Sequence, residues 1–311
     1  MSFLNLLNCA SQAVIAFWRP SKLNGPAELD GLDVTYLVKQ AIKESTRSGD
    51  LFINLKMFYS ARWMAQRIRL GRCLYPYENR AWEKMLILGV GAGSQQTRLV
   101  GYQHTSITPH HSNFFLAKDE AAITPLPGAI VTCGDVTRDW IERDGNYPGG
   151  MFSSACALRQ ELAVNEDGGQ KQGPIANLLV ALGTGDDEYA SAPGFLEDAL
   201  TTGDRFQVRL RPHPSLATLD LPQSPVYSIS TGSLADDLKW ADAILYTSST
   251  VSMEAIALGI PAVYLDLGNF LSTDPLFGWT EFKWSVTEPS RLIENIETIE
   301  SLPQNRFEDI Q

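Results

Sequence analysis

The segment WADAILYTSSTVSMEAIALGIPAVYLDLG, residues 240–268, decides the fold class of this chain. Residues 242–246 form a short apolar run typical of a buried strand, residues 251–258 carry apolar side chains at helical spacing, and residues 261–267 form a second apolar run. Gly259 follows the helical pattern, where glycine commonly ends a helix. The segment predicts a strand, a helix and a second strand, which is the repeating unit of an α/β fold.

Hydroxyl side chains fill the turn between the first strand and the helix. Ser248, Ser249 and Thr250 follow Thr247 directly. Serine and threonine cap helices routinely, so one of them needs no further explanation. Three in a row exceed what a cap requires, and a turn at the amino end of a helix favours an anion such as a phosphate.

A second motif lies upstream of this turn. Residues 205–210 (RFQVRL) predict a strand that runs into Arg211, Pro212, His213 and Pro214. The prolines end the strand and place His213 at its carboxyl end. Ligands of open parallel sheets bind outside the carboxyl ends of the strands, so we expect His213 and the hydroxyl turn to face the same crevice.

This pair of motifs resembles the donor domain of bacterial glycosyltransferases with two Rossmann-like domains (GT-B type). It is especially similar to the CMP-sugar enzymes of surface polysaccharide assembly, which transfer sialic acid or Kdo (3-deoxy-manno-octulosonate). The resemblance covers residues 177–268 and implies that His213, Ser248 and Ser249 bind the phosphate of the donor, with Glu254 a candidate for the ribose hydroxyls. CDP-glycerol glycerophosphotransferases and UDP-sugar 2-epimerases carry similar pairs and remain alternatives.

Two further features belong to the predicted donor side. Residues 177–182 predict a strand that ends in a turn with Gly183 and Gly185, which can bring backbone close to a phosphate but lacks the rest of a dinucleotide fingerprint. Arg211 can face a phosphate or a sugar carboxylate, or can be an exposed charge at a strand end.

The 311 residues suffice for two domains. Turn residues at 145–150 (GNYPGG) and 164–174 place the junction so that residues 1–150 form an acceptor-side domain and residues 151–311 a donor-binding domain. In the first domain, predicted strands at 51–55, 73–77, 98–103 and 130–133 alternate with predicted helices, and the glycines at 89–93 are expected to end the helix that begins at Ala81. The predicted fold class is α/β, with two Rossmann-like domains that face a central cleft.

Candidate catalytic residues follow strands of the first domain. Glu78 comes after the strand at 73–77 and Asp135 after the strand at 130–133, and each suits either an acid/base role or a helix-start charge. His104 follows the strand at 98–103 and is preferred over His110 and His111 as an acid/base or acceptor-binding residue. Glycosyl transfer needs a stabilised leaving phosphate and a base for the acceptor hydroxyl, and the two halves of the chain would supply these separately.

No metal or cofactor is expected. The three histidines match no standard ligand spacing, and the chain contains no Asp-x-Asp motif, so the donor would bind as a substrate without a chelated ion.

Charge excludes one class of partner. Residues 1–150 carry 16 Lys and Arg against 13 Asp and Glu, whereas residues 151–311 carry 9 against 23. The chain lacks a basic stripe for nucleic acid, although Arg62, Arg67, Arg69 and Arg72 form a cluster that is a solvated helix face or a contact for anionic lipid or a phosphorylated acceptor.

The remaining expectations concern location and packing. Four cysteines without paired spacing indicate a reduced, cytoplasmic protein. Residues 1–18 predict an amphipathic helix packed on the protein or, alternatively, lying on the inner face of a membrane. The tail aromatics are expected in the core or a domain interface, namely Phe270, Phe277, Trp279, Phe282 and Trp284.

Taken together, the sequence predicts a glycosyltransferase that moves a sugar from a nucleotide donor, CMP-Kdo or a related CMP-sugar, to a glycan or lipid-linked acceptor. The product would belong to a surface polysaccharide such as lipopolysaccharide or capsule. A nucleotide-sugar-binding component of an assembly complex, without catalysis, is the alternative from another class.

Overall fold

The structure is a computed structural model that describes residues 3–18, 25–29, 31–157, 174–201, 205–216, 218–219 and 221–302. The chain divides into two compact units. Unit 1 comprises Met1–Thr105 and Asn113–Ala157, and unit 2 comprises Ser106–Ser112 and Leu158–Gln311. The chain passes from unit 1 to unit 2 for the last time after Ala157, and the turn-rich residues 164–173 lie outside the described part.

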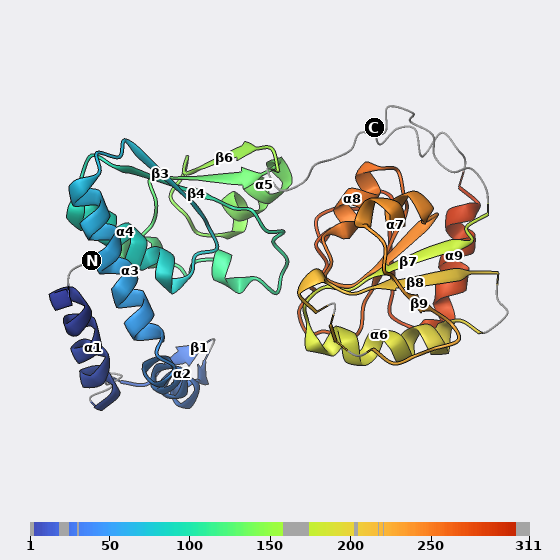
Figure 1. The fold of residues 1–311 in the computed structure, drawn as a ribbon, viewed down its shortest axis with the longest axis horizontal. Coiled ribbons are helices and arrows are strands. Elements are labelled where there is room, and N and C mark those ends of the chain that lie inside the picture. Colours follow the sequence, from blue (N-terminus) through green and yellow to red (C-terminus); the bar gives the residue numbers. More distant parts are fainter. Residues whose placement is uncertain are drawn as a thin grey trace. The chain divides into compact units, whose positions relative to one another are not determined.

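Unit 2 contains a parallel sheet of six strands in the order β12-β11-β10-β7-β8-β9. Strands β7, β8 and β9 lie side by side in Figure 1. Numbered within the unit, this is the order 3-2-1-4-5-6 of a dinucleotide-binding Rossmann sheet. The strands are β7 (Asn177–Ala181), β8 (Gln207–Arg211), β9 (Ser228–Ile229), β10 (Ala243–Tyr246), β11 (Ala262–Leu265) and β12 (Lys283–Val286). The helices are α6 (Asp186–Ala199), α7 (Leu234–Trp240), α8 (Val251–Ala257) and α9 (Leu292–Glu300), with short 3-10 helices at Pro214–Leu216 and Pro289–Arg291.

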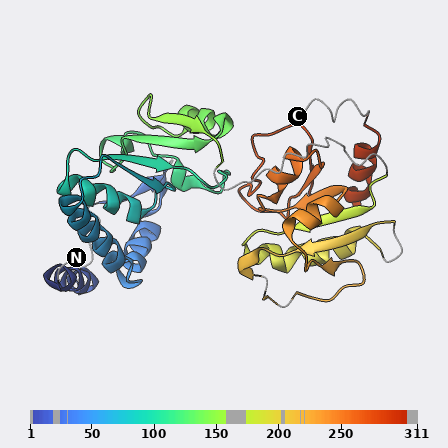
Figure 2. The same cartoon turned by 45° about the horizontal axis from the view of Figure 1, so that its top comes forward.

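Apolar side chains bury both faces of this sheet. On one face Leu178, Val180 and Leu245 pack with side chains of α6 and α9, and on the other Leu179 and Ile244 pack with side chains of α7 and α8. Figure 2 shows helices on both sides of the sheet. Because strands covered on both faces alternate between two apolar layers, they read as unbroken apolar runs in sequence. The strands predicted at 177–182, 242–246 and 261–267 are confirmed by β7, β10 and β11.

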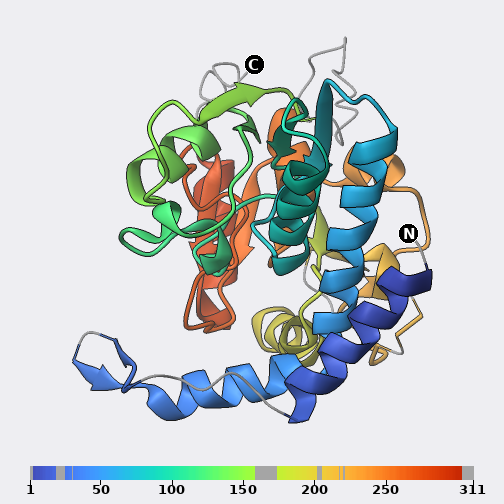
Figure 3. The same ribbon diagram turned by 90° about the vertical axis from the view of Figure 1, so that its left-hand side faces the viewer.

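Unit 1 contains a parallel sheet of four strands in chain order, β3-β4-β5-β6. The strands are β3 (Arg72–Pro76), β4 (Arg98–Tyr102), β5 (Ala129–Cys133) and β6 (Phe152–Ala155). The helices are α1 (Phe3–Trp18), α2 (Thr35–Arg47), α3 (Asp50–Arg67), α4 (Ala81–Gly93) and α5 (Asp135–Asp144), with 3-10 helices at Ser112–Phe114 and Glu120–Ala122 and a small hairpin of β1 (Glu28–Leu29) and β2 (Leu32–Asp33). Figure 3 shows α1 lying beside α3. Among the described residues, no helix has both the length and the apolar content needed to cross a membrane.

Two local predictions for unit 1 are wrong, and close helix packing explains both. Residues 51–55 are not a strand, because they belong to the first turns of α3. The helix predicted at 81–88 does not end at Gly89, because α4 continues to Gly93. A Cβ on Gly89 would lie 2.4 Å from the Phe58 carbonyl oxygen and 2.8 Å from Ala61 Cβ, so these glycines let α3 and α4 approach each other.

The predicted core packing of the tail aromatics holds for only some of them, and their placement in a domain interface stays a prediction. Phe270 is fully exposed, and Phe277 and Trp279 are exposed by 46% and 37%, so these aromatics are not core residues within unit 2. Trp284 does pack against the core, because it lies on β12. Residues 152–155, which were expected in the second domain, form β6 and pair with β5 of unit 1.

We expect Gly89→Ala to destabilise the protein, because its methyl group would collide with the backbone of α3. The expected loss is about 1–3 kcal/mol in the free energy of unfolding, measured by urea denaturation. Gly91→Ala is the matched control in the same helix, since nothing lies within 4 Å of its added Cβ. That variant should be stabilised by about 0.5–1 kcal/mol, and equal effects of both changes would contradict the packing explanation.

Candidate functional site

The site in unit 2 lies at the carboxyl ends of three neighbouring strands, β10, β7 and β8. The strand order reverses between β7 and β10, and ligands of such sheets bind in the crevice at that point. The turn with Gly183 follows β7, the turn with Ser248 follows β10, and His213 follows β8. The structure thus brings the predicted motifs to one edge of one sheet.

A buried glutamate ties two of these turns together. Glu188, in the first turn of α6, is only 3% exposed, and its carboxylate accepts the backbone N–H of Gly183 at 2.7 Å. The same carboxylate accepts the hydroxyls of Thr247 and Ser248. Three donors compensate the desolvation of this carboxylate, because hydrogen bonds to a charged group are worth about 1.5–3 kcal/mol each. The turns are so close that a Cβ on Gly183 would lie 1.9 Å from Ser248 Oγ.

Tyr189, which follows Glu188, connects the glycine turn to the turn that carries His213. The hydroxyl of Tyr189 donates to the Gly183 carbonyl at 3.1 Å and accepts the backbone N–H of His213 at 2.8 Å. Glu188 and Tyr189 together connect all three strand ends. Neither residue was expected from the sequence, although both follow the glycine turn in the segment GTGDDEY, residues 183–189.

His213 presents one ring nitrogen for a ligand. Its Nδ1 accepts the backbone N–H of Ser215 at 3.2 Å and lies 2.7 Å from Ser215 Oγ. With Nδ1 an acceptor, the neutral ring carries its proton on Nε2. The described residues supply no partner for that nitrogen, so Nε2–H is a donor for an anion.

Arg211 is not a simple exposed charge. Its guanidinium donates to Asp237 at 2.7 Å and to the Gly232 carbonyl at 3.0 Å, and Asp237 is only 1% exposed. Asp237 also accepts the hydroxyl of Ser230. Arg211 therefore anchors the end of β8. Burial raises the pKa of the Glu254 carboxyl, and the positive charge of Arg211 opposes this shift in part.

The other predicted donor-side residues have different surroundings. Ser249 is buried, and its carbonyl accepts the hydroxyl of Ser252 at 3.0 Å inside the first turn of α8. Thr250 is exposed at the N-cap of α8, and its side chain makes no capping hydrogen bond. Gly185 is the N-cap of α6.

The candidate catalytic residues lie at the carboxyl edge of the sheet in unit 1, and two of them are close together. His104 Nε2 lies 3.8 Å from Glu78 Oε1, and Arg80 Nε lies 3.4 Å from Glu78 Oε2. His104 Nδ1 is buried without a hydrogen-bond partner among the described residues. An unsatisfied buried nitrogen is costly and is often explained by a role in binding or catalysis.

Asp135 is in a different environment. It begins α5, is 67% exposed, and pairs with Arg138 at 2.5 Å. The hydroxyl of Ser154 and the charge of Arg138 lower the pKa of this carboxyl. These contacts are those of a helix-start charge.

A second buried glutamate positions the turn that carries Glu78. Glu83 is 1% exposed and accepts the backbone N–H groups of Glu78, at 3.0 Å, and Asn79, at 3.0 Å. Asn79 has a φ of 57°, and its side chain donates to the Asn113 carbonyl at 2.7 Å. Burial raises the pKa of Glu83, although the backbone hydrogen bonds oppose the shift.

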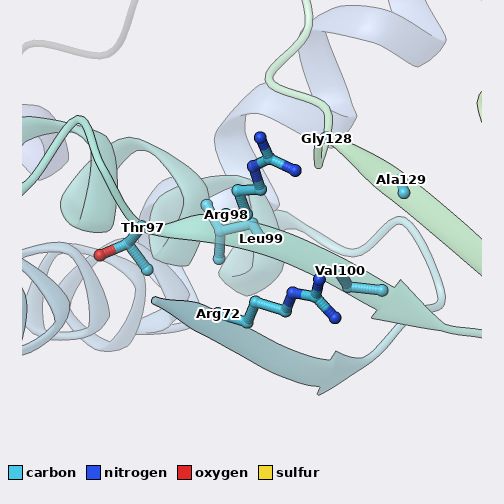
Figure 4. Close-up of a pocket in the computed structure, with 7 residues that line it drawn as sticks. All are labelled: Arg72, Thr97, Arg98, Leu99, Val100, Gly128 and Ala129. Atoms are coloured by element: carbon cyan, nitrogen blue, oxygen red, sulfur yellow. The ribbon is translucent and has the colours of Figure 1, made fainter. Parts of the chain in front are cut away.

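A separate concavity of about 560 Å³ lies at the amino ends of β3 and β4 (Figure 4). Arg72 and Arg98 are paired in register on these strands and line it together with Thr97, Leu99, Val100, Gly128 and Ala129. Because it lies at the opposite end of the strands from Glu78 and His104, it is not part of the predicted site. Its two exposed guanidinium groups suit an anionic ligand.

Metal ligands do not gather in the part of the chain that the structure describes, where no group of three His, Cys, Asp or Glu side chains is close enough to hold an ion. His104 belongs to unit 1, whereas His110 and His111 belong to unit 2. His111 Nδ1 accepts the backbone N–H of Thr108 at 3.2 Å.

Comparison with known proteins identifies the fold. No family model and no curated protein matches the sequence. Solved structures do match, among them the glycosyltransferase of kitacinnamycin, at 15% identity and a TM-score of 0.54, with 88% of this chain and 84% of that chain covered. The UDP-GlcNAc 2-epimerases of Methanocaldococcus jannaschii and Rickettsia bellii match at 13% identity and TM-scores of 0.51, covering 82% and 83% of this chain and 75% of theirs. These matches and the parallel sheets show an α/β fold of the GT-B type with two Rossmann-like domains.

We expect Gly183→Ala to cost about 1–3 kcal/mol in the free energy of unfolding, because the methyl group would displace the Ser248 hydroxyl. The same change should cost less than half as much in a Ser248→Ala background, which removes the colliding atom. A double-mutant cycle by urea denaturation measures this coupling. Gly194→Ala on α6, with nothing within 4 Å of its added Cβ, is the control and should not be destabilised. Additive effects at positions 183 and 248 would refute the close approach.

We expect Glu83 to make stability depend on pH. Its pKa is raised in the folded protein, so the folded state binds more protons than the unfolded state as the pH rises above about 4.5. The free energy of unfolding should therefore fall with rising pH in wild type relative to Glu83→Gln, until the pH passes the pKa of the folded state. The slope is at most about 1.4 kcal/mol per pH unit for one group. Denaturation curves of both proteins from about pH 4 to 8 measure the difference. A wild-type advantage that grows with pH would contradict this sign.

Proposed function

We propose that this protein is a glycosyltransferase that takes a sugar from a nucleotide-activated donor, with the nucleotide bound in unit 2. One observation carries the proposal: Glu188 and Tyr189 join the turns with Gly183, Ser248 and His213 at the switch point of a Rossmann-ordered sheet. Buried hydrogen bonds of this kind hold loops in defined positions, and a phosphate-binding site requires such positions.

The donors proposed for the phosphate include His213 Nε2–H and the hydroxyls of Ser249 and Thr250. Ser248 has a single O–H, and that proton is committed to Glu188 in this structure. Its proposed role is to link the turns. Glu254 is proposed to accept the ribose hydroxyls, and Arg211 to hold the end of β8 and contribute positive charge.

Glu78 and His104 are the proposed acid/base pair. The 3.8 Å separation lets the carboxylate orient the neutral imidazole and stabilise the imidazolium that forms when His104 takes the proton of an acceptor hydroxyl. Asp135 suits this role less, because its carboxylate is already engaged by Arg138 and Ser154. Glu83 would act only through the turn it holds.

The donor is proposed to be a CMP-sugar, with CMP-Kdo as the first candidate, and the acceptor a glycan or lipid-linked glycan of a surface polysaccharide, lipopolysaccharide or capsule. The His-Pro and Ser-Ser-Thr motifs support this choice. No metal is proposed to take part, so transfer should be the same with and without a chelator.

Binding of CMP, CDP, UDP and GDP, measured by calorimetry, tests the nucleotide site. We expect CMP to bind most tightly, and His213→Ala to weaken binding about tenfold or more, since a charge-assisted hydrogen bond is lost. His110→Ala is the matched control, because it removes an exposed imidazole elsewhere in unit 2. Absence of binding by all four nucleotides would mean that the joined turns are structural only.

Product analysis then separates the alternatives. Conversion of a UDP-sugar without any acceptor would indicate an epimerase, and transfer of a polyol phosphate from CDP-glycerol would indicate the glycerophosphotransferase. For a sugar transferase, Glu78→Gln should lower the rate about 100-fold or more with nucleotide binding unchanged, and Asp135→Asn less than tenfold. A protein that binds nucleotide but is indifferent to both changes would be a non-catalytic component of an assembly complex.

A further inference from the structure

Helix α1 packs on unit 1 through its small and polar side chains. Cys9 is fully buried, and Asn5, Ala13 and Ala16 are half-buried, which defines one stripe at helical spacing. This stripe lies against the helical part of unit 1, where α1 contacts α2 and α3. The side chain of Asn8 donates to the hydroxyl of Tyr59 on α3 at 2.7 Å.

The large apolar side chains of α1 point away from the protein. We call Phe3, Leu4, Leu7, Val14, Ile15 and Trp18 the outer face of α1. Each is at least half exposed, with Phe3 at 72%, Leu4 at 75% and Trp18 at 77%. This orientation is the opposite of that of an ordinary surface helix of a globular protein, whose apolar stripe faces the core. Contiguous exposed apolar surface of this kind indicates an interaction site.

Exposed basic residues lie on the side of α3 that contacts α1. Tyr59 contacts α1, and Lys56 and Arg62 lie three residues before and after it, on the same side of α3 and exposed. The helix α1 itself has no charged residue, and residues 51–77 contain five Lys and Arg but no Asp or Glu. The two helices that contact α1, α2 and α3, together carry six Lys and Arg against two acidic residues, Glu44 and Asp50, so the part of unit 1 next to α1 has net positive charge.

We propose that the outer face of α1 inserts into the surface of an anionic lipid bilayer, with Lys56 and Arg62 beside it contacting lipid phosphates. With 16 residues, α1 is shorter than the roughly 20 needed to span a bilayer, so it would lie in the plane of the interface. Trp18 at its end suits the polar boundary of the membrane. Each nearby basic residue adds attraction to anionic lipid.

A second copy of the chain fits this surface less well. Two copies that paired symmetrically through α1 would bring the same patch of each together. Lys56 and Arg62 of both copies would then crowd one interface, and like charges there are unfavourable. The lipid surface supplies the opposite charge instead.

Vesicle sedimentation of the full chain tests the proposal. We expect binding to vesicles of phosphatidylcholine with phosphatidylglycerol, and binding at least tenfold weaker to phosphatidylcholine alone. Leu7→Glu with Val14→Glu should weaken binding to the mixed vesicles at least tenfold without unfolding the protein, because both side chains point outward. Ile123→Glu is the matched control, since this residue of unit 1 is 85% exposed and lies outside the helices that form the surface.

Lys56→Gln with Arg62→Gln tests the charged part. This variant should bind the mixed vesicles about tenfold less tightly and lose most of the preference for phosphatidylglycerol. Unchanged vesicle binding by the Glu variant would overturn the proposal. The proposal would also be overturned if light scattering showed that the wild type is a dimer and the Glu variant is a monomer, because a second copy would then cover α1.

Discussion

Three strand ends of unit 2 are held in place by hydrogen bonds from two consecutive residues of α6. The buried carboxylate of Glu188 accepts from Gly183, Thr247 and Ser248, and Tyr189 connects Gly183 to His213. A carboxylate buried to this degree is stable only when its acceptor capacity is used, so the turns and the glutamate require one another. The geometry of the whole candidate nucleotide site depends on this arrangement.

Unit 1 contains a similar buried glutamate at the start of a helix. Glu83 follows the N-cap of α4 by three residues, as Glu188 follows the N-cap of α6, and each accepts backbone N–H groups of the preceding turn. In both units the helix is the one that leaves the first strand of the parallel sheet. A glutamate three residues after the N-cap is the acidic residue of a capping box. Here its carboxylate also holds the preceding loop in place, in addition to capping the start of the helix. In both units, therefore, a buried glutamate holds the turn that follows the first strand, although the sequences of the units are not alike.

The pattern of apolar residues predicted most strands of both sheets, because parallel strands buried on both faces are unbroken apolar runs. It failed at residues 51–55 and at Gly89. A short apolar run fits a strand or a buried helix equally, and only length decides between them. A glycine inside a helix has the same local signature as one at its end, and the partner that requires it, here Phe58 and Ala61 of α3, is not visible in the local pattern.

The sequence by itself determined the fold class, the strand ends that carry His213, Ser248, Glu78 and His104, and the motifs that suggest a nucleotide. These follow from local periodicity and from where prolines, glycines and hydroxyls interrupt it. Only the tertiary structure decided that the Ser248 hydroxyl is committed to Glu188, that Arg211 is paired with buried Asp237, and that α1 turns its large apolar side chains outward. These facts depend on contacts between residues far apart in the chain, and on which face of a helix finds a neighbour, and neither is encoded in spacing alone.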